Sequence, residues 1–184
     1  LFTAPTKSDG TLLVLGTNAD FGILGINNHT QYSSPVQMPG TTWRTIQCGG
    51  SVASATRTDG TLWVWGQNED SGSNGDNQTS SNASSPKQVP GTTWSTEMRA
   101  SGYNSQNATM AIKSDGTMWA IGNNGYGGLG LNQPTSTKYS SPVQVPGTTW
   151  SVVSGGDAHF GAIKTDGTFW TWGRIYVGKL GHDS

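Results

Sequence analysis

The sequence is poor in cysteine, in charge and in long apolar runs. Its single cysteine, Cys48, excludes an internal disulfide and a zinc site built from several thiolates. Only 11% of the 184 residues are charged and the net charge is −1, which argues against a nucleic-acid surface, because such a surface concentrates Lys and Arg. The apolar runs are too short to cross a bilayer, so we expect no membrane insertion.

Glycine and tryptophan are abundant instead. The chain has 27 Gly and 8 Trp. A composition rich in Gly, Ser, Thr and Asn is typical of disordered segments, but eight large apolar side chains need burial and therefore predict a folded core. The chain begins at Leu1 and shows no signal peptide, so we expect it to be processed or to be a fragment of a longer protein.

Three sequence markers repeat along the whole chain. A basic residue followed by Ser or Thr and then Asp-Gly-Thr begins at Lys7, Arg57, Lys113 and Lys164, at spacings of 50, 56 and 51 residues. A Ser-Ser-Pro-x-Gln-x-Pro-Gly-Thr-Thr-Trp stretch ends at Trp43, Trp94 and Trp150. Gly-x-Leu-Gly begins at residues 22, 127 and 178, and Asn74 replaces its Leu in the copy at 72–75. A shared period of about 51 residues indicates a repeat protein.

Each repeat reads as four short strands. Asp-Gly predicts a hairpin with a type I′ turn, in which both central residues have positive φ. The flanking strands are expected before each turn, at 53–58 and 109–114, and after it, at 12–15, 62–65, 118–121 and 169–172. The prolines of Pro-x-Gln-x-Pro suit only an edge strand. Four-stranded antiparallel sheets repeated radially are the plan of a β-propeller.

The repeats divide the chain into units at about 1–42, 43–93, 94–149 and 150–184. The first unit lacks a Trp-led strand and the last lacks a Pro-x-Gln-x-Pro strand, so the chain holds about three and a half repeats. We therefore predict an all-β, single-domain segment of a larger propeller, with possible assembly onto further chain or other subunits.

One stretch of motifs resembles a known repeat. The pattern Gly156-x-x-His159-x-x-Ala162-Ile163-x-x-Asp166-Gly167-Thr168-x-x-x-Trp172-Gly173, followed by Gly178-Lys179-Leu180-Gly181, resembles the repeat of the regulator of chromosome condensation family. The resemblance implies a propeller, usually of seven blades, whose loops grip a protein partner. Members include a nucleotide exchange factor for a small GTPase, a plant photoreceptor and secreted bacterial inhibitors; the regular, Lys-poor sequence is more similar to the bacterial and phage branch.

We expect a non-enzymatic binding or scaffold module that recognises a protein or a surface glycan, with no cofactor or metal. A structural or adhesion role on a phage virion or bacterial surface is the favoured setting, and a cytoplasmic location stays open. The alternative is a regulatory propeller such as a GTPase nucleotide-exchange factor. The sequence shows no phosphate-binding loop, nucleophile elbow or HExxH motif, which argues against an enzyme.

Two regions are candidate partner-binding surfaces. Trp94 and Asp115 are separated by five more residues than their counterparts, which places an insertion near 100–107; insertions in repeats fall in loops, often on the binding face. The loops before each Gly-x-Leu-Gly motif form the second region. Together the candidate contacts are Asp20, Phe21, Glu69, Asp70, Tyr103, Asn104, Gln106, Asn124, Tyr126 and Tyr176.

Other chemistry-bearing residues have structural interpretations. The four Asp-Gly-Thr aspartates and the basic residue before each are interpreted as turn chemistry, and the tryptophans as core packing. Cys48 is expected to be a buried strand residue, and His159 a packed or capped one. The stretch from Asp70 has a faint similarity to a calcium loop, but Ser81 stands where the loop needs a Glu.

Overall fold

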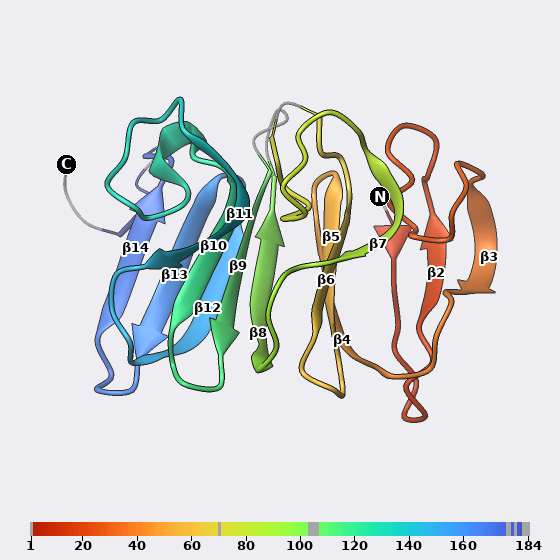
Figure 1. Ribbon diagram of the computed structural model, residues 1–184, viewed down its shortest axis with the longest axis horizontal. Coiled ribbons are helices and arrows are strands. Elements are labelled where there is room, and N and C mark those ends of the chain that lie inside the picture. The colour runs from red at the N-terminus through yellow and green to blue at the C-terminus, as the bar shows by residue number, and fades with distance from the viewer. Residues whose placement is uncertain (1, 70, 103–106, 176–177, 179, 182–184) are drawn as a thin grey trace.

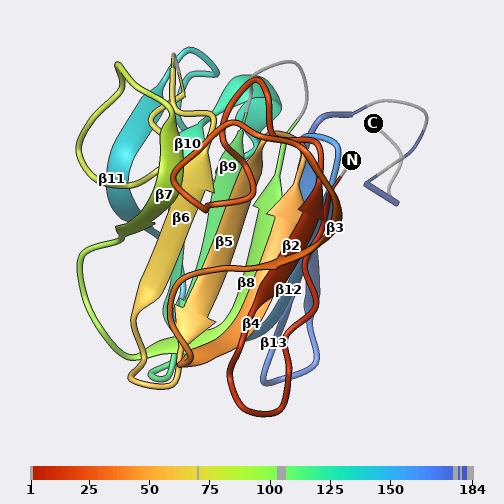
Figure 2. The ribbon, with the colours of Figure 1, turned by 90° about the vertical axis from the view of Figure 1, so that its right-hand side faces the viewer.

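Four antiparallel sheets stand side by side in the computed structural model, which describes the chain except residues 1, 70, 103–106, 176–177, 179 and 182–184. Figure 1 shows the first sheet at the right and the fourth at the left, and Figure 2 shows them stacked behind one another. The only described helix is a three-residue 3-10 turn, Gly125–Gly127. No helix in the described part is long or apolar enough to cross a membrane.

The strands follow the repeat. The first sheet contains β1 (Phe2–Thr3), β2 (Leu13–Gly16) and β3 (Tyr32–Gln37). The second contains β4 (Trp43–Gly49), β5 (Val52–Arg57), β6 (Leu62–Gly66) and β7 (Ala83–Gln88). The third contains β8 (Trp94–Ser101), β9 (Ala108–Lys113), β10 (Met118–Asn123) and β11 (Lys138–Val145). The fourth contains β12 (Trp150–Gly156), β13 (His159–Lys164) and β14 (Phe169–Gly173).

The order of the strands confirms the predicted edge role of the proline-bearing segments. β3, β7 and β11 each lie at one edge of their sheet, beside β2, β6 and β10. β4, β8 and β12 lie at the opposite edge, where β8 contacts β4 on one side and β12 on the other. These Trp-led strands are therefore the inner strands, and the proline-bearing strands are the outer ones.

Three apolar layers between successive sheets form the core. The first layer includes Leu12, Val14 and Met38 from the first sheet with Trp43 and Trp65 from the second. The other layers join the second sheet to the third and the third to the fourth in the same way. Burial of this apolar area on both faces of each central sheet explains why the third strand of the repeat is apolar throughout.

The hairpin turns differ from the predicted type I′. Gly10, Gly60, Gly116 and Gly167 have φ between 78° and 83°, whereas none of the preceding aspartates has a positive φ. In the first copy the Gly10 N–H donates to the Lys7 carbonyl, and the Lys7 N–H donates to the Thr11 carbonyl. This is a three-residue loop with one left-handed glycine, typical of a type I turn followed by a bulge. The I′ prediction was wrong because Asp bonds its own turn instead of adopting positive φ.

The insertion is divided between a strand and a loop. Gly49 pairs with Val52 in the second sheet, whereas Ser101 pairs with Ala108 in the third, so the hairpin of the third sheet is longer. The bulge after Trp94 is also larger, because Trp94 pairs with Lys113 and Met98 with Ala111. The sequence had placed all of the extra residues in one loop near 100–107, but the structure divides them between that loop and the bulge in β8.

Cys48 is exposed on β4, so the prediction of a buried cysteine was wrong. Its side chain lies on an inner strand, where the surrounding groups still desolvate the thiol and raise the pKa of Cys48 to about 12. The thiol is therefore protonated at neutral pH and a poor nucleophile.

Candidate functional site

The loops that follow β2, β6 and β10 gather along one edge of the molecule, the upper edge in Figure 1. Each is held by a buried asparagine: Asn18, Asn68 and Asn124 are at most 2% exposed. The Asn18 side chain accepts from the Leu24 N–H at 2.9 Å and donates to the Asn28 carbonyl at 2.8 Å. Asn68 and Asn124 make equivalent bonds in their own loops. One amide thus fixes both ends of each loop.

Each loop is also attached to the next sheet. The Asn27 N–H donates to the Ser84 carbonyl at 2.7 Å, and the Asn77 N–H donates to the Ser140 carbonyl at 2.8 Å. The indole of Trp65 donates to the Ile23 carbonyl at 2.7 Å, and that of Trp172 donates to the Gly128 carbonyl at 2.9 Å. These bonds make the loop edge a pre-organised surface, because its backbone is tied to two sheets at once.

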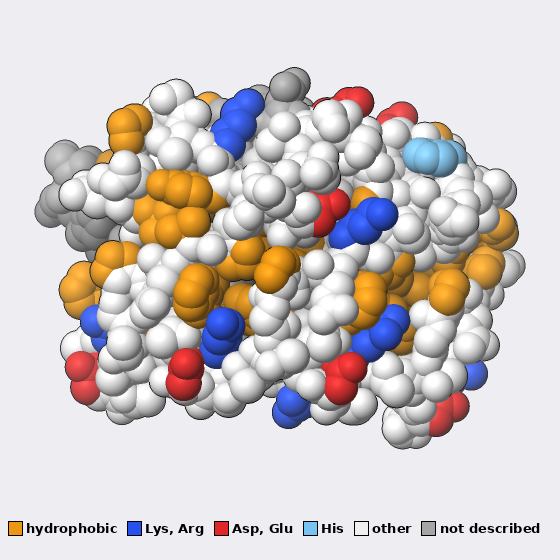
Figure 3. Space-filling model, viewed as in Figure 1, with side chains coloured by type: hydrophobic (Ala, Val, Ile, Leu, Met, Phe, Trp, Pro, Cys, Tyr) orange, Lys and Arg blue, Asp and Glu red, His pale blue; other side chains and the backbone are white. Residues whose placement is uncertain are grey.

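Several predicted contact residues do project from this edge. Asp20 and Glu69 are exposed, Phe21 is half-buried and Tyr126 is 44% exposed. Figure 3 shows acidic side chains at the upper edge over the first and second sheets. At the other end of this edge the Arg174 guanidinium lies 5.1 Å from the centre of the Tyr126 ring.

A hollow of about 120 Å³ opens beside Asp20 and Phe21. Its walls come from the first loop and from the hairpin between β4 and β5, and they are formed by Phe2, Thr17, Asn18, Ala19, Asp20, Phe21, Ile23, Gly50 and Ser51. The contribution of Gly50 and Ser51 carried no sequence signal, because these residues lie in a different repeat from the loop they face. The hollow is the size of a single side chain of a partner.

Asn124 does not fit its predicted role. It is 1% exposed and its side chain donates to the Gln133 and Pro134 carbonyls, so it positions the loop and cannot contact a partner. Asp70, Tyr103, Asn104, Gln106 and Tyr176 lie outside the described residues. At the C-terminal end of the insertion the Asn107 amide donates to Gln67 Oε1 at 2.9 Å, beside the second loop.

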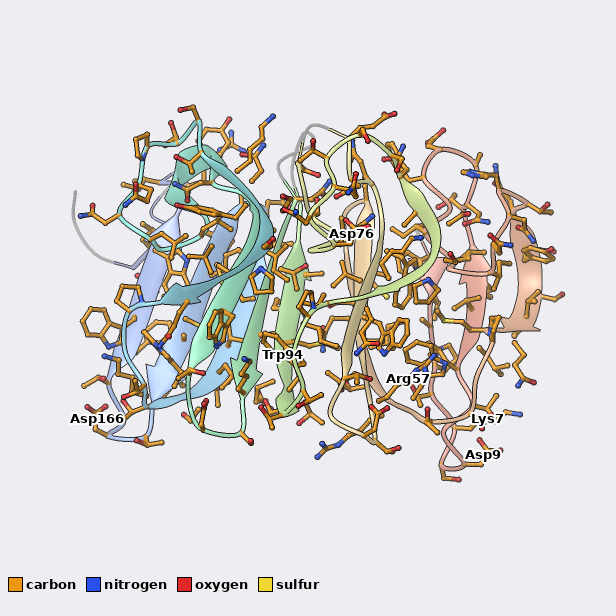
Figure 4. The ribbon with its side chains drawn as sticks, viewed as in Figure 1. Lys7, Asp9, Arg57, Asp76, Trp94 and Asp166 are labelled. Atoms are coloured by element: carbon orange, nitrogen blue, oxygen red, sulfur yellow. The ribbon has the colours of Figure 1, made fainter. Side chains whose placement is uncertain are left out.

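The opposite edge carries the Asp-Gly-Thr turns, and their repeated chemistry is structural as predicted (Figure 4). In the second sheet the Trp63 indole donates to Thr61 Oγ1 at 2.8 Å, and Thr61 Oγ1 donates to Asp59 Oδ1 at 2.6 Å. The third and fourth sheets repeat this relay. These bonds from Thr lower the pKa of each turn aspartate.

A cation lies between two tryptophans in the same three sheets. The Arg57 guanidinium lies 4.4 Å from the ring centre of Trp43 and 4.2 Å from that of Trp63. Lys113 and Lys164 occupy the equivalent places between Trp94 and Trp119 and between Trp150 and Trp170. The basic residue of the turn motif therefore joins the inner strand to the third strand through cation–π contacts.

The described residues contain no group of three or more His, Cys, Asp or Glu side chains close enough to share a metal ion. His159 is half-buried on β13, and its Nδ1 lies 3.1 Å from the Asp157 carbonyl oxygen. This agrees with the capped strand histidine that the sequence suggested.

Comparison with known proteins agrees with this architecture. Residues 115–163 match the model of the regulator of chromosome condensation (RCC1) repeat. The crystal structure of human WBSCR16 is similar with a TM-score of 0.82 and 22% identity, covering 98% of this chain and 47% of that one. Yeast RCC1 (Prp20) bound to Kap60 is similar with a TM-score of 0.76 and 18% identity, covering 97% and 42%.

A second structure of Prp20p, from Saccharomyces cerevisiae and described with its binding to Gsp1p and histones, has a TM-score of 0.76 and 19% identity, covering 94% of this chain and 43% of that one. The chain thus spans less than half the length of these three structures. Residues 115–163 thus match a regulator of chromosome condensation (RCC1) repeat, and the chain has the fold of part of an RCC1-like β-propeller.

Proposed function

We propose that the chain is a non-enzymatic protein-binding module whose partner contacts the loop edge. The observation that carries the proposal is the pre-organised loop backbone, tied to two sheets, with exposed Asp20 beside a side-chain-sized hollow and exposed Glu69 on the next loop. A rigid scaffold that displays loops in this way is a common basis for recognition, because little conformational entropy is lost on binding. Prp20 structures described with Kap60, Gsp1p and histones support a protein as the partner.

The acidic side chains favour a partner with a basic surface. Asp20 and Glu69 are exposed on neighbouring loops. At the other edge each turn aspartate comes two residues after a Lys or Arg, so that edge carries charges of both signs. Complementary charge mainly raises the association rate and the specificity of such a contact. We place the module on a phage virion or bacterial surface, a setting that the low charge and the Ser, Thr, Asn and Gly content favour.

A photo-crosslinking amino acid tests the proposed face. It is placed at exposed Ala19 on the loop edge and, as the matched control, at exposed Ser114 on the turn edge. We expect a specific protein adduct from the Ala19 position that excess unlabelled protein competes away, and none from Ser114. Adducts from Ser114 alone, or capture of glycan without protein, would contradict the proposal.

Charge reversal tests the same contact in solution once the partner is captured. Asp20→Lys combined with Glu69→Lys is expected to weaken partner binding about tenfold or more and to reduce its salt dependence, whereas Ser114→Lys leaves both unchanged. Release of nucleotide from a GTPase accelerated by the chain would instead favour the exchange-factor alternative.

A further inference from the structure

The outer edges of the first three sheets carry the same short sequence. β3, β7 and β11 each pair with one strand on their inner side, and no described strand pairs with the other side. The shared sequence is Ser-Ser-Pro-x-Gln-x-Pro, at 33–39, 84–90 and 140–146. An open strand edge offers a row of unpaired N–H and C=O groups to any second strand, and this edge recurs three times in one chain.

The hydrogen bonds of the sheet determine which backbone groups face outward. β3 is antiparallel to β2, and the Met38 N–H donates to the Leu12 carbonyl at 2.9 Å. Successive N–H groups of a strand point to opposite sides, so the Gln37 N–H points away from β2 because that of Met38 points toward it. By the same alternation the backbone nitrogens of Pro35 and Pro39 also lie on the outward side.

Proline thus occupies the outward positions on both sides of the glutamine. Because proline has no N–H, only the Gln37 N–H can donate from this part of the edge. In the second sheet the Val89 N–H donates to the Leu62 carbonyl at 2.8 Å, which gives the same alternation. The corresponding outward prolines are Pro86 and Pro90 in the second sheet and Pro142 and Pro146 in the third.

A bulge beside the first proline interrupts each edge further. Val14 pairs with Val36 and Gly16 with Tyr32, so four residues along β3 correspond to two along β2. The same irregularity occurs between β6 and β7 and between β10 and β11. A bulge bends and twists the strand that contains it, which makes the edge a poor template for a second strand.

Charge does little to protect these edges. A lysine on an edge strand is another common barrier to pairing, but β3 has no charged residue, and β7 and β11 have one each, Lys87 and Lys138. The three strands are also close copies of one another, so any of them would suit any other as a partner. The missing N–H groups are therefore the barrier that all three edges share.

We propose that the outer rim, meaning the exposed edges of β3, β7 and β11, is a surface closed to strand addition, and that Pro35, Pro86 and Pro142 close it. Copies of this chain and extended segments of other proteins are thereby prevented from extending the first three sheets. A molecule that binds the outer rim has to do so through side chains, and the exposed glutamines of the three copies are available for this. The proposal does not depend on the proposed function of the loop edge.

Two triple variants, each with three new threonines, test the closing residues. The first adds an outward N–H to every edge: Pro35→Thr, Pro86→Thr and Pro142→Thr. The control places the same side chains one residue earlier and adds no N–H: Ser34→Thr, Ser85→Thr and Ser141→Thr. Circular dichroism and melting curves first show that both variants fold, and sedimentation velocity at increasing concentration then measures self-association.

We expect the proline variant to self-associate at least about tenfold more tightly than the unaltered protein, because its edges gain donors. The serine variant is expected to stay within about twofold of the unaltered protein, because its edges keep the same donors. Self-association of the proline variant no tighter than that of the serine variant would overturn the proposal.

Hydrogen exchange shows whether the new contacts lie at the outer rim. Pairing through the outer edges should slow exchange of the Gln37, Gln88 and Gln144 N–H groups as the concentration rises, since each would then donate to a second strand. Association of the proline variant without this slowing would also overturn the proposal, because it would use another surface. If the triple variant does not fold, Pro86→Thr and Ser85→Thr in the four-stranded second sheet give the same two readouts.

Discussion

The Asp-Gly-Thr turn shows how one short motif sets both a backbone conformation and a chain of side-chain contacts. The Asp59 carboxylate accepts from the N–H and the hydroxyl of Thr61, which accepts in turn from the Trp63 indole. Arg57 lies against Trp63 in the same hairpin. In the three copies that form this relay, removing any member would leave its neighbours without a partner, so turn, strand and cation form one unit.

This unit predicts how stability depends on pH. The folded pKa of each turn aspartate is below the ordinary value of 3.8, because Thr donates to the carboxylate. Their contribution is therefore complete above the unfolded pKa and is lost as the pH falls through the folded value. We expect the melting temperature of the triple variant Asp59→Asn, Asp115→Asn, Asp166→Asn to fall less steeply from pH 5 to pH 2.5 than that of the unaltered protein.

Asp20→Asn is the control for this experiment, because Asp20 is exposed in a loop and belongs to no Asp-Gly-Thr turn. It removes a carboxyl group without removing a turn bond. The melting temperature of this variant is therefore expected to fall between pH 5 and pH 2.5 as steeply as that of the unaltered protein. Equal steepness for all three proteins would show that the turn carboxylates do not control acid unfolding.

Cys48 gives a second prediction at this scale. With a pKa of about 12, its thiol is almost wholly protonated at pH 8, although the side chain is exposed. Alkylation by iodoacetamide, followed by intact mass, is expected to be at least tenfold slower in the folded protein than after denaturation in urea, because the thiolate is the reactive form. A folded rate equal to the denatured rate would contradict the raised pKa.

At the scale of strands and sheets, the repeat period determined most of what the sequence could predict. Pro35 and Pro86 placed the outer strands correctly, because proline fits only the edge of a sheet. The turn type was wrong because Asp-Gly fits two hairpin geometries. The exposure of Cys48 and the burial of Asn124 were not predictable, since both depend on contacts between units that a linear pattern does not contain. The hollow at Gly50 and Ser51 was missed for the same reason.

One of the three layers between sheets departs from the apolar pattern. Between the second and third sheets, Asn74 replaces the leucine that Leu24 and Leu129 provide in the other layers, and Ile121 replaces the tryptophan of Trp65 and Trp172. Both polar atoms of the Asn74 side chain are buried without a partner among the described residues, as are the hydroxyls of Ser54, Thr56 and Thr109. Buried polar groups of this kind cost stability unless ordered water binds them.

We therefore expect Asn74→Leu to stabilise the fold. It replaces two unpartnered polar atoms by methyl groups on a side chain of the same branching and is expected to raise the free energy of unfolding by about 1–3 kcal/mol, measured by urea denaturation. Leu129→Asn makes the reverse change in the layer between the third and fourth sheets and is expected to lower it by a similar amount or more. Destabilisation by Asn74→Leu would mean that the asparagine is satisfied by groups or water within the layer.

For the molecule as a whole, one side chain joins three of the four sheets at their inner edges. Arg99 on β8 donates from Nη1 to Gln47 Oε1 on β4 at 2.8 Å and from Nε to the Gly155 carbonyl on β12 at 3.1 Å. The apolar layers and the hydrogen bonds of the loops each link two neighbouring sheets. A planar guanidinium can span both acceptors at once, whereas an ammonium group offers one nitrogen.

Arg99→Lys is expected to lower the free energy of unfolding by about 1–3 kcal/mol, because it keeps the charge but cannot serve both acceptors. Arg44→Lys, at an exposed position on β4, is the control and is expected to change it by less than about 0.5 kcal/mol. Hydrogen exchange adds the decisive readout: loss of the bridge should increase exchange in β4 and β12 together, although the substitution lies in β8. Faster exchange confined to β8 would mean that Arg99 stabilises its own strand and does not couple the sheets.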